Sequence, residues 1–469
     1  MEPVTIGELL HATGGRLLGE APDLSQTLKY VDTDSRSIHE GALFVPLVGP
    51  RFDGHAFIED ALNDGAAGTF TARERERYLP GKFYILVKNT QRALRDLARY
   101  YKQRFQIPYI CVTGSVGKTT TKDMLAAVLG TKYKVLKTEG NFNNELGLPL
   151  TLLRLNKSHE CAVLEMGMSS KGEIDYLSEI VEPDVAVITN IGDSHIEHLG
   201  SRENILSAKC EIFNYMKPDG LAVLNGDDPL LRTLEGTLPM PICWCGKEPG
   251  NDYRAWNIRG DGESHTHCTI QKNEETPYDL EIPALGDHMV YPVLMAAAVG
   301  AHFGISEEDV KRGVSDFSPT KMRMNILHRG DNITILDDAY NANPQSMRAA
   351  VEVLAQTKGS YKIAVLGDMF ELGPLAPMLH RGVGEYLGKK GIDCLVAIGE
   401  MAGELCEAAK ASGVPNAQHF DTQEEAFPLL EGLLQEGCTV LVKASRGMAF
   451  ERIVAKLKEC TKQLELQSQ

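Results

Sequence analysis

The stretch that most constrains this chain is CVTGSVGKTTTKD, residues 111–123. It continues an apolar run rich in β-branched residues, PYICVTG, and it opens a segment of helical periodicity that ends at Gly130. A strand, a glycine loop and a helix N-terminus in this order cradle phosphate, because the loop amides and the helix dipole both favour an anion. The common pattern G-x-x-x-x-G-K-[ST] would require glycine at 112, where this chain has Val112. We therefore predict a shorter variant of a phosphate loop.

The residues of this loop predict a nucleotide site. Glycines let backbone N–H groups point at the ligand, Lys118 would reach the β- and γ-phosphates, and the Thr119 hydroxyl would hold Mg²⁺. The alternative is a glycine turn with a surface lysine, and Gly-Lys-Thr-Thr-Thr in a strand–loop–helix setting argues against it. The predicted ATP-binding loop consists of Thr113, Gly114, Ser115, Val116, Gly117, Lys118, Thr119 and Thr120.

Short apolar runs that end in polar or acidic residues recur after this loop. CAVLEMG, DVAVITNIG and GLAVLNGDD have this form, which suits buried parallel strands with a site at their carboxyl ends. Residues 240–285 differ, with β-type alternation, turns and little helix. A second series, from ITILDDAY to TVLVKASRG, follows FSPTKMRMN (317–325), which we interpret as a linker. This second series is typical of a Rossmann-like domain.

The length of 469 residues predicts about three domains at roughly 150 residues each. The first hundred residues alternate short strand-like runs with polar helical patterns, and an amphipathic helix, ALRDLARYYKQRF, precedes Pro108. We predict an α/β protein with a small N-terminal α/β domain at 1–106, a central P-loop-type ATPase domain with a parallel sheet at 107–318, and a C-terminal Rossmann-like domain at 319–469.

Charge and cysteine usage exclude several classes of protein. The net charge of −16 argues against a nucleic-acid partner, which requires a basic face. Cys111, Cys161 and Cys394 lie inside apolar runs, as small core residues do in proteins of a reducing compartment. The start, MEPVTIGELL, lacks the features of a signal peptide, and no apolar run approaches the ~20 residues that span a bilayer. We expect a cytoplasmic monomer that binds neither nucleic acid nor membrane.

Polar residues follow other strand-like runs and are candidates for the same site. Glu165 ends CAVLEMG, where a carboxylate could bind Mg²⁺ directly or through water. His195, in TNIGDSHIEHLGS, follows another strand end, but by itself it fits a hydrogen-bonded loop histidine because Mg²⁺ prefers oxygen ligands. Lys209, in SAKCEIF, is by itself an ordinary helix lysine.

Together these pieces resemble the Mur ligase superfamily of peptidoglycan synthesis. The loop TGSVGKTT is similar to that family's own variant, in which the glycines are closer together than in the common pattern. The resemblance covers nearly the whole chain. It is also carried by DSR (34–36), RFDGH (51–55), NFNNELGLP (141–149), EMGM (165–168), DDAYNANPQSM (337–347) and LGDMFELG (366–373).

The resemblance implies an ATP-dependent amide-bond ligase with ATP and Mg²⁺ at two metal sites. Its substrates would be UDP-N-acetylmuramoyl-tripeptide, whose C-terminal carboxylate is activated as an acyl phosphate, and D-alanyl-D-alanine, whose amine then attacks. The sequence leaves open whether the third residue of the tripeptide is diaminopimelate or lysine. Two rivals stay open: a related ligase acting on a different carboxylate and amine, and a kinase or nucleotide switch that stops at phosphate transfer.

The resemblance also implies roles for single residues near the phosphates. Lys118, Lys209 and His195 would be catalytic, with Lys209 as a carbamate that supplies oxygen ligands. The metal ligands would be Thr119, Glu165, His195 and Lys209. Residues outside the loop that would contact ATP are His288, Arg323, Asp337 and Asp338.

The substrate-binding residues implied by the resemblance come from all three domains. Ser35 and Arg36 would hold the UDP end, and Asn141 and Asn144 would face the substrate. The incoming amine substrate would meet Asp368, Lys443, Ser445 and Arg446.

One stretch departs from the family pattern. The superfamily often has G-x-H-N-x-x-N, whose asparagines approach the adenine. In GDHMVYPVLMAAAVG, Met289 and Pro292 stand in the asparagine places, so only His288 is carried over.

Overall fold

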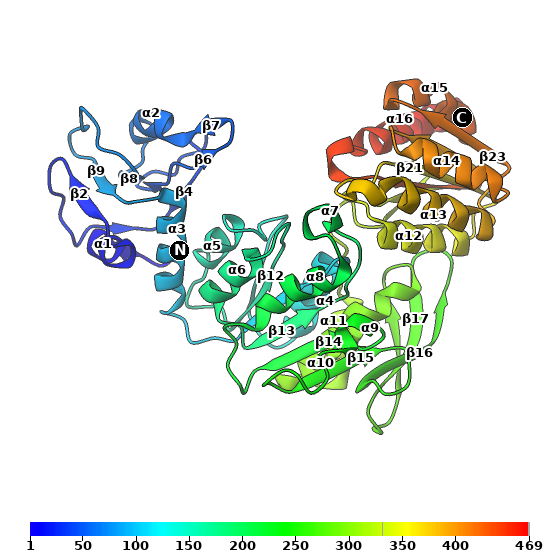
Figure 1. Ribbon diagram of the computed structural model, residues 1–469, viewed down its shortest axis with the longest axis horizontal. Coiled ribbons are helices and arrows are strands. Elements are labelled where there is room, and N and C mark those ends of the chain that lie inside the picture. The colour runs from blue at the N-terminus through cyan, green and yellow to red at the C-terminus, as the bar shows by residue number, and fades with distance from the viewer. Residues whose placement is uncertain (331, 468–469) are drawn as a thin grey trace.

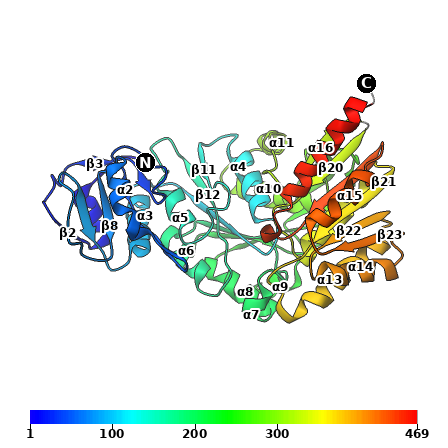
Figure 2. The ribbon, with the colours of Figure 1, turned by 90° about the horizontal axis from the view of Figure 1, so that it is seen from above.

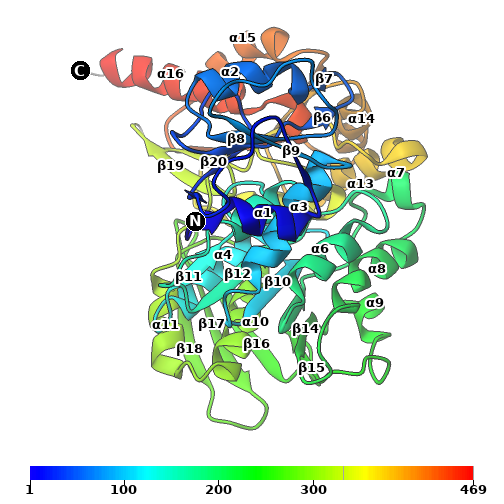
Figure 3. The same cartoon turned by 90° about the vertical axis from the view of Figure 1, so that its left-hand side faces the viewer.

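The computed structural model describes residues 1–330 and 332–467, which form three α/β units, each built on its own sheet (Figure 1). The N-terminal and C-terminal units lie at opposite ends of the molecule, and both stand on the same side of the central unit (Figures 1 and 3). The predicted α/β class and three-part architecture are confirmed.

The N-terminal unit is a small α/β domain. Its elements are β1 (Val4–Thr5), α1 (Ile6–Thr13), β2 (Arg16–Leu18), β3 (Thr27–Leu28), β4 (Val31–Asp32), β5 (Leu43–Phe44), β6 (Val48–Gly49), β7 (Phe52–Asp53), α2 (Ile58–Asn63), β8 (Gly68–Thr71), β9 (Phe83–Leu86) and α3 (Thr90–Lys102). Five strands form a sheet in the order β2-β9-β8-β5-β4, in which only the β2–β9 pair is antiparallel. Thr5 and Glu8 form a capping box that starts α1.

Helix α3 joins the N-terminal unit to the central unit. Its buried face carries Leu94, Leu97 and Tyr101, while its basic residues meet helix α6 (Glu173–Val181). Arg95 pairs with Glu179 and stacks on the ring of Tyr176, and Lys102 pairs with Glu182 at 3.1 Å. A long amphipathic helix with its own ion pairs therefore fixes how the two units meet.

The central unit is a nine-stranded sheet in the order β11-β12-β10-β13-β14-β15-β16-β17-β18. Its other elements are β10 (Tyr109–Thr113), α4 (Lys118–Leu129), β11 (Val135–Lys137), α5 (Gly147–Leu152), β12 (Cys161–Glu165), β13 (Val185–Ile188), α7 (Ile196–Leu199), α8 (Arg202–Cys210), β14 (Leu221–Asn225), α9 (Pro229–Arg232), β15 (Ile242–Gly246), β16 (Tyr253–Gly260), β17 (Thr266–Lys272), β18 (Tyr278–Ile282), α10 (Val290–His302) and α11 (Glu307–Ser315). Neighbours from β11 to β16 are parallel, and β16, β17 and β18 form an antiparallel extension. The predicted parallel sheet and the predicted β-rich segment at 240–285 are confirmed.

Strand β10 lies in the middle of the parallel part, with β12 and β13 as its neighbours. Its side chains alternate between the two faces of the sheet. Ile110 and Val112 belong to the core shared with α4, α10 and α11, whereas Tyr109 and Cys111 belong to the core on the other face. Val112 is therefore a fully buried strand residue and not a distorted loop residue.

The C-terminal unit has a six-stranded sheet in the order β19-β20-β24-β21-β22-β23, parallel except for β19. Its elements are β19 (Asn325–Arg329), β20 (Ile333–Asp337), α12 (Pro344–Gln356), β21 (Tyr361–Gly367), α13 (Ala376–Lys389), β22 (Cys394–Ile398), α14 (Ala402–Ala411), β23 (Asn416–Phe420), α15 (Gln423–Leu433), β24 (Cys438–Lys443) and α16 (Glu451–Gln467). Helices α13 and α14 cover one face, and α15 and α16 cover the other (Figure 2). Helices on both faces of a mostly parallel sheet match the predicted Rossmann-like character. In the described part of the chain, no helix has both the length and the apolar character needed to cross a membrane.

Candidate active site

The loop between β10 and α4 is shaped by two glycines. Gly114 has φ +148°, and a Cβ there would lie 3.0 Å from Thr189 Cβ, 3.1 Å from its backbone nitrogen, and well inside contact distance of its hydroxyl oxygen. Gly117 caps α4 with φ +83°, and a Cβ there would meet nothing within 4 Å. The turn therefore begins at Gly114, and both positions require a backbone that other residues rarely adopt.

The segment that follows β13 holds the loop in place. The amide of Ser115 donates to the carbonyl of Asn190 at 3.0 Å, and the amide of Val116 donates to the side-chain oxygen of Asn190 at 2.9 Å. The hydroxyl of Thr189 donates to the carbonyl of Val116 at 2.5 Å. Lys118 folds back over the loop, where its Nζ donates to the Gly114 carbonyl at 2.9 Å. Burial lowers the pKa of Lys118. The nearby carboxylate of Glu165 opposes this shift, and the guanidinium of Arg323 adds to it.

Thr119 and Glu165 meet directly beside the loop. Glu165 ends β12 opposite Val112 of β10, and it is almost fully buried. The Thr119 hydroxyl donates to Glu165 Oε2 at 2.8 Å, and Asn143 Nδ2 donates to Glu165 Oε1 at 2.7 Å. Both carboxylate oxygens are therefore positioned by side chains from two other segments.

Asn143 was missed by sequence reasoning, which chose its neighbours Asn141 and Asn144. The run of asparagines in NFNN marked the segment, but which of them turns inward depends on the loop conformation. Asn141 and Asn144 line the same cavity as Glu165, and Asn144 Oδ1 also accepts the amide of Gly147 at 2.9 Å and so holds the start of α5.

His195 and Lys209 approach the loop from α7 and α8. His195 has φ +63° at the start of α7, and its Nδ1 contacts the carboxylate of Glu371 from the C-terminal unit. Lys209 is buried, and no hydrogen bond or ion pair to its Nζ is found among the described residues. Burial lowers the pKa of Lys209 well below its ordinary value, and nearby Lys118 lowers it further.

The linker before β19 and the C-terminal unit complete the site. Arg323 Nη2 donates to the Thr119 hydroxyl at 3.2 Å, and its guanidinium lies 4.1 Å from the centre of the Tyr340 ring. Lys443 Nζ pairs with Asp338 Oδ2 at 2.5 Å in a nearly buried ion pair. Burial lowers the pKa of Lys443, and Asp338 opposes that shift. The linker and the C-terminal unit thus each place one cation, Arg323 and Lys443 respectively, at the cavity beside the phosphate loop.

Most of the predicted residues converge on one cavity of about 390 Å³. It is bounded by all three of the segments just described: the phosphate loop, the ends of the central strands and the linker with the C-terminal unit. The site residues predicted from the sequence that line this cavity are Ser115, Val116, Gly117, Lys118, Thr119, Thr120, Asn141, Asn144, Glu165, His195, His288, Arg323, Asp338 and Lys443. Among these lining residues, burial lowers the pKa of the His288 imidazole. Thr113 ends β10 and Gly114 begins the turn, and neither residue lines the cavity.

Asp337 points away from this cavity although Asp338 lines it. Asp337 is the last residue of β20, and the amide of Asp338 still donates to the Val442 carbonyl of β24 at 3.0 Å, so the two side chains face opposite sides and only Asp338 lines the cavity. Asp337 faces a neighbouring space lined by Pro319 and Lys458, and burial raises its pKa.

Three further predicted residues of the C-terminal unit also lie outside the cavity. Asp368 Oδ1 accepts the amide of Ala402 at 2.7 Å, and Ser445 Oγ accepts the amide of Phe370 at 2.8 Å. Arg446 is exposed and pairs with Glu451 at 3.0 Å. Their proposed role in binding the amine substrate stays a prediction.

The predicted UDP-binding residues lie in the N-terminal unit, away from the loop. Ser35 is half-buried, and Arg36 is exposed and pairs with Asp34 at 2.7 Å. Hydrogen bonds from Arg36 lower the pKa of Asp34 to about 2.

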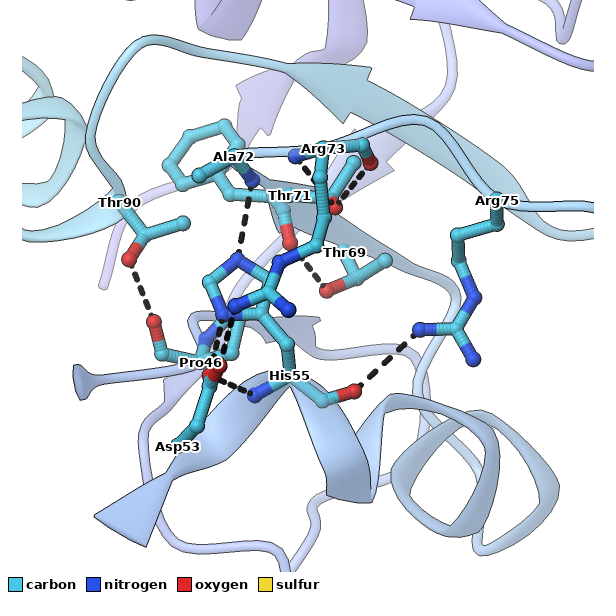
Figure 4. Close-up of polar contacts among 10 residues, drawn as sticks. Pro46, Asp53, His55, Thr69, Thr71, Ala72, Arg73, Arg75 and Thr90 are labelled. Atoms are coloured by element: carbon cyan, nitrogen blue, oxygen red, sulfur yellow. Dashed lines mark hydrogen bonds and ion pairs between the residues drawn. The ribbon is translucent and has the colours of Figure 1, made fainter. Parts of the chain in front are cut away.

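The RFDGH motif of the same unit is centred on a buried histidine (Figure 4). His55 Nδ1 is 2.7 Å from Asp53 Oδ1, and its Nε2 accepts the amide of Ala72 at 2.9 Å. These two bonds require the proton on Nδ1. Arg73 also pairs with Asp53, and Arg75 donates to the His55 carbonyl at 3.3 Å. The motif therefore joins β7 to the segment after β8.

A phosphate loop on a central parallel sheet, with a cavity that the C-terminal α/β unit helps to line, defines a nucleotide-binding α/β protein. Three family models match the chain: the Mur ligase family catalytic domain at residues 27–102, the Mur ligase middle domain at 112–300, and the Mur ligase glutamate ligase domain at 322–446. The chain belongs to the Mur ligase family, as its sequence motifs indicated.

Three relatives illustrate the similarity. The UDP-N-acetylmuramoyl-tripeptide–D-alanyl-D-alanine ligase of Bacillus subtilis is 42% identical over 441 residues, which cover 93% of this chain and 95% of the relative. The chain is 34% identical in sequence to MurF from Acinetobacter baumannii. The crystal structure of that protein superimposes with a TM-score of 0.90, over 98% of this chain and 99% of that one. MurF ligase from Thermotoga maritima in complex with ADP is 30% identical, with a TM-score of 0.82 over 92% of this chain and 98% of that one.

Proposed function

We propose that this protein is an ATP-dependent ligase that joins D-alanyl-D-alanine to the C-terminal carboxylate of UDP-N-acetylmuramoyl-tripeptide in peptidoglycan precursor synthesis. The observation that carries the proposal is the contact between Arg323 of the linker and Thr119 of the phosphate loop, at 3.2 Å. It makes one cavity from two domains, as the joining of separately bound substrates requires. The relatives from Bacillus subtilis and Acinetobacter baumannii, which align over nearly their full lengths, support the choice of substrates.

The residues that line the cavity suit the transfer of a phosphoryl group. Lys118 and Arg323 would face the ATP phosphates and stabilise charge as the γ-phosphoryl group moves to an oxygen of the peptide carboxylate. The bond between the γ-phosphorus and the β–γ bridging oxygen breaks, and ADP leaves. The product is an acyl phosphate, whose carbonyl carbon is then open to attack.

The amine of D-alanyl-D-alanine attacks that carbonyl carbon and forms a tetrahedral intermediate. The intermediate expels phosphate, the former amine loses its protons to solvent, and an amide remains. Water would hydrolyse the acyl phosphate, so the C-terminal unit must cover it during the reaction. The contacts of Glu371 with His195 and of Asn343 with Ser194, the latter at 2.8 Å, would help to hold that cover.

Magnesium fits the donor set beside the loop. Thr119 and Glu165 offer a hydroxyl and a carboxylate 2.8 Å apart, and Mg²⁺ takes oxygen ligands while keeping waters or phosphate oxygens. Among the described residues, no three His, Cys, Asp or Glu side chains are grouped to hold a metal, so the fit is to a magnesium–nucleotide complex. When bound, Mg²⁺ supplies neutralising charge on the phosphates.

A second magnesium site would involve His195 and Lys209. A lysine that loses its proton on burial has a free amine, and such an amine can react with carbon dioxide to form a carbamate. The buried Nζ of Lys209 and its lowered pKa favour that form, which would convert a cation into oxygen ligands.

The remaining assignments are proposals at the same level. Ser35 and Arg36 would hold the UDP end, and the C-terminal unit would bind the dipeptide. The proposed domains are 1–106, 107–318 and 319–469. We also propose that the chain acts as a monomer in the cytoplasm.

Mass spectrometry of the product tests the proposal. Purified protein is incubated with ATP, D-alanyl-D-alanine and UDP-N-acetylmuramoyl-tripeptide containing either diaminopimelate or lysine. We expect ADP release only when both peptide substrates are present, together with a product heavier than the tripeptide nucleotide by the dipeptide less one water. ADP release without the dipeptide, or a stable phosphorylated product, would instead support a kinase.

A further inference from the structure

A second cavity of about 510 Å³ lies on the other side of the phosphate loop from Glu165. It shares Val116, Gly117 and Thr120 with the phosphate cavity, so one ligand can extend through both. Its walls include the apolar side chains of Pro229, Leu230 and other residues, and its volume is within the range of small-ligand pockets.

The wall from the central unit has little unused hydrogen-bonding capacity. Asp193 is bound by Arg202 through two hydrogen bonds of 2.7 and 2.8 Å. Asp227 accepts the hydroxyl of Tyr291 at 2.9 Å and also backbone amides, while Asp228 caps α9. Pro292, which also lines this wall, has no polar side-chain atom to offer. This wall can therefore enclose a flat ring but has few free polar groups with which to recognise it.

The opposite wall comes from the C-terminal unit and carries an unpaired cation. Arg348, on α12, lines this cavity and not the phosphate cavity. Across the described ranges its guanidinium has no hydrogen bond and no ion pair, and it rests against α13, where a Cβ on Gly382 would lie 3.0 Å from its Nη2. The second arginine that lines this cavity, Arg202, is already paired with Asp193.

We propose that Arg348 is a nucleotide-specificity residue, whose planar guanidinium covers the purine base of ATP in this cavity. The inference rests on the proposed function, because it assumes that ATP is the nucleotide. Guanidinium groups stack on aromatic faces, and a cation there is attracted by the ring. Since Arg348 belongs to the C-terminal unit, a bound base bridges two domains and favours their docked arrangement.

The test compares binding of ADP with binding of tripolyphosphate, which occupies the phosphate loop but has no base. In Arg348→Gln, we expect the Kd for ADP to rise about 2- to 30-fold and the Kd for tripolyphosphate to stay unchanged. Arg348→Lys keeps the charge but not the planar group, so it should not restore ADP affinity. Arg381→Gln is the matched control, since Arg381 is exposed on α13 and pairs with Glu404 at 2.9 Å.

Two results would overturn the inference. One is an unchanged Kd for ADP in Arg348→Gln; the other is an equal loss for ADP and tripolyphosphate, which would mark Arg348 as a phosphate contact. Because Arg348 is exposed, its variants should have the same Tm as the wild type, and thermal unfolding checks this. If the wild type itself bound no ADP, the proposed function would fail; if it bound ADP and formed amide, only the role of Arg348 would be in question.

Discussion

Gly114→Ala should destabilise the central unit and abolish the phosphate site. The backbone at 114, with φ +148°, lies in a region that only glycine adopts freely, and other residues there cost about 1–3 kcal/mol. The new methyl group would also press on Thr189, 3.0 Å from its Cβ and 3.1 Å from its backbone nitrogen. Forcing extra atoms into a packed site adds about 1–3 kcal/mol.

The two terms together give about 2–6 kcal/mol, which corresponds to a fall in Tm of roughly 4–24 °C for a unit of this size. Because Thr189 donates to the Val116 carbonyl, its displacement also disturbs the loop itself. Differential scanning fluorimetry measures the first effect, and calorimetric titration with ADP measures the second.

Gly117→Ala is the matched control for stability. Its φ of +83° carries the backbone strain, but its Cβ meets nothing within 4 Å, so the loss should be only about 1–2 kcal/mol. Adding Thr189→Ala to Gly114→Ala removes the hydroxyl that the methyl group strikes, and should recover part of the lost Tm. The reasoning is wrong if Gly114→Ala melts no earlier than Gly117→Ala, or if it binds ADP with wild-type affinity.

Three further substitutions test the site. Asp338→Asn leaves the buried ammonium of Lys443 without its charged partner, with the Asn341 carbonyl as its remaining acceptor, so it should cost about 3–5 kcal/mol in thermal unfolding; an unchanged Tm would show that the pair is not buried. Asp337→Asn should raise Tm at neutral pH, because burial raises the pKa of Asp337 above 3.8 and its ionised form costs stability above that raised pKa. The gain should vanish below pH 3.8, and a gain that persists there would contradict this cause. Glu165→Gln and Thr119→Ala should each raise the Mg²⁺ concentration for half-maximal ADP release at least ~10-fold, whereas Thr119→Ser should not; equal behaviour of the two threonine variants would exclude the hydroxyl as a ligand.

The fold and the phosphate loop could be predicted because their determinants are local. Runs such as CAVLEMG and DVAVITNIG are apolar throughout, which indicates strands buried on both faces, and β12 and β13 lie where these runs predicted. Val112 is an example, because the identity of residue 112 decides whether the glycine turn starts inside the strand or after it. The first glycine stands at 114, which predicted a turn that starts after the strand.

Contacts between distant segments could not be predicted in the same way. The sequence indicated an acidic pair at 337 and 338, but the alternation of side chains at the end of β20 decides that Asp338, and not Asp337, lines the phosphate-loop cavity. Asn143 and Arg348 gain their positions from a loop conformation and from domain docking, respectively. Neither produces a pattern in the local sequence, so reasoning from spacing passed over both.

Oxygen-18 transfer tests most directly whether the peptide carboxylate is phosphorylated. The tripeptide nucleotide is prepared with both oxygens of its C-terminal carboxylate labelled and is converted with ATP and D-alanyl-D-alanine. An acyl phosphate predicts that each turnover moves one labelled oxygen into inorganic phosphate, detected by mass spectrometry or by the isotope shift in phosphorus NMR. Unlabelled phosphate alongside amide product would contradict the mechanism, because the carboxylate oxygen would then have left by another route.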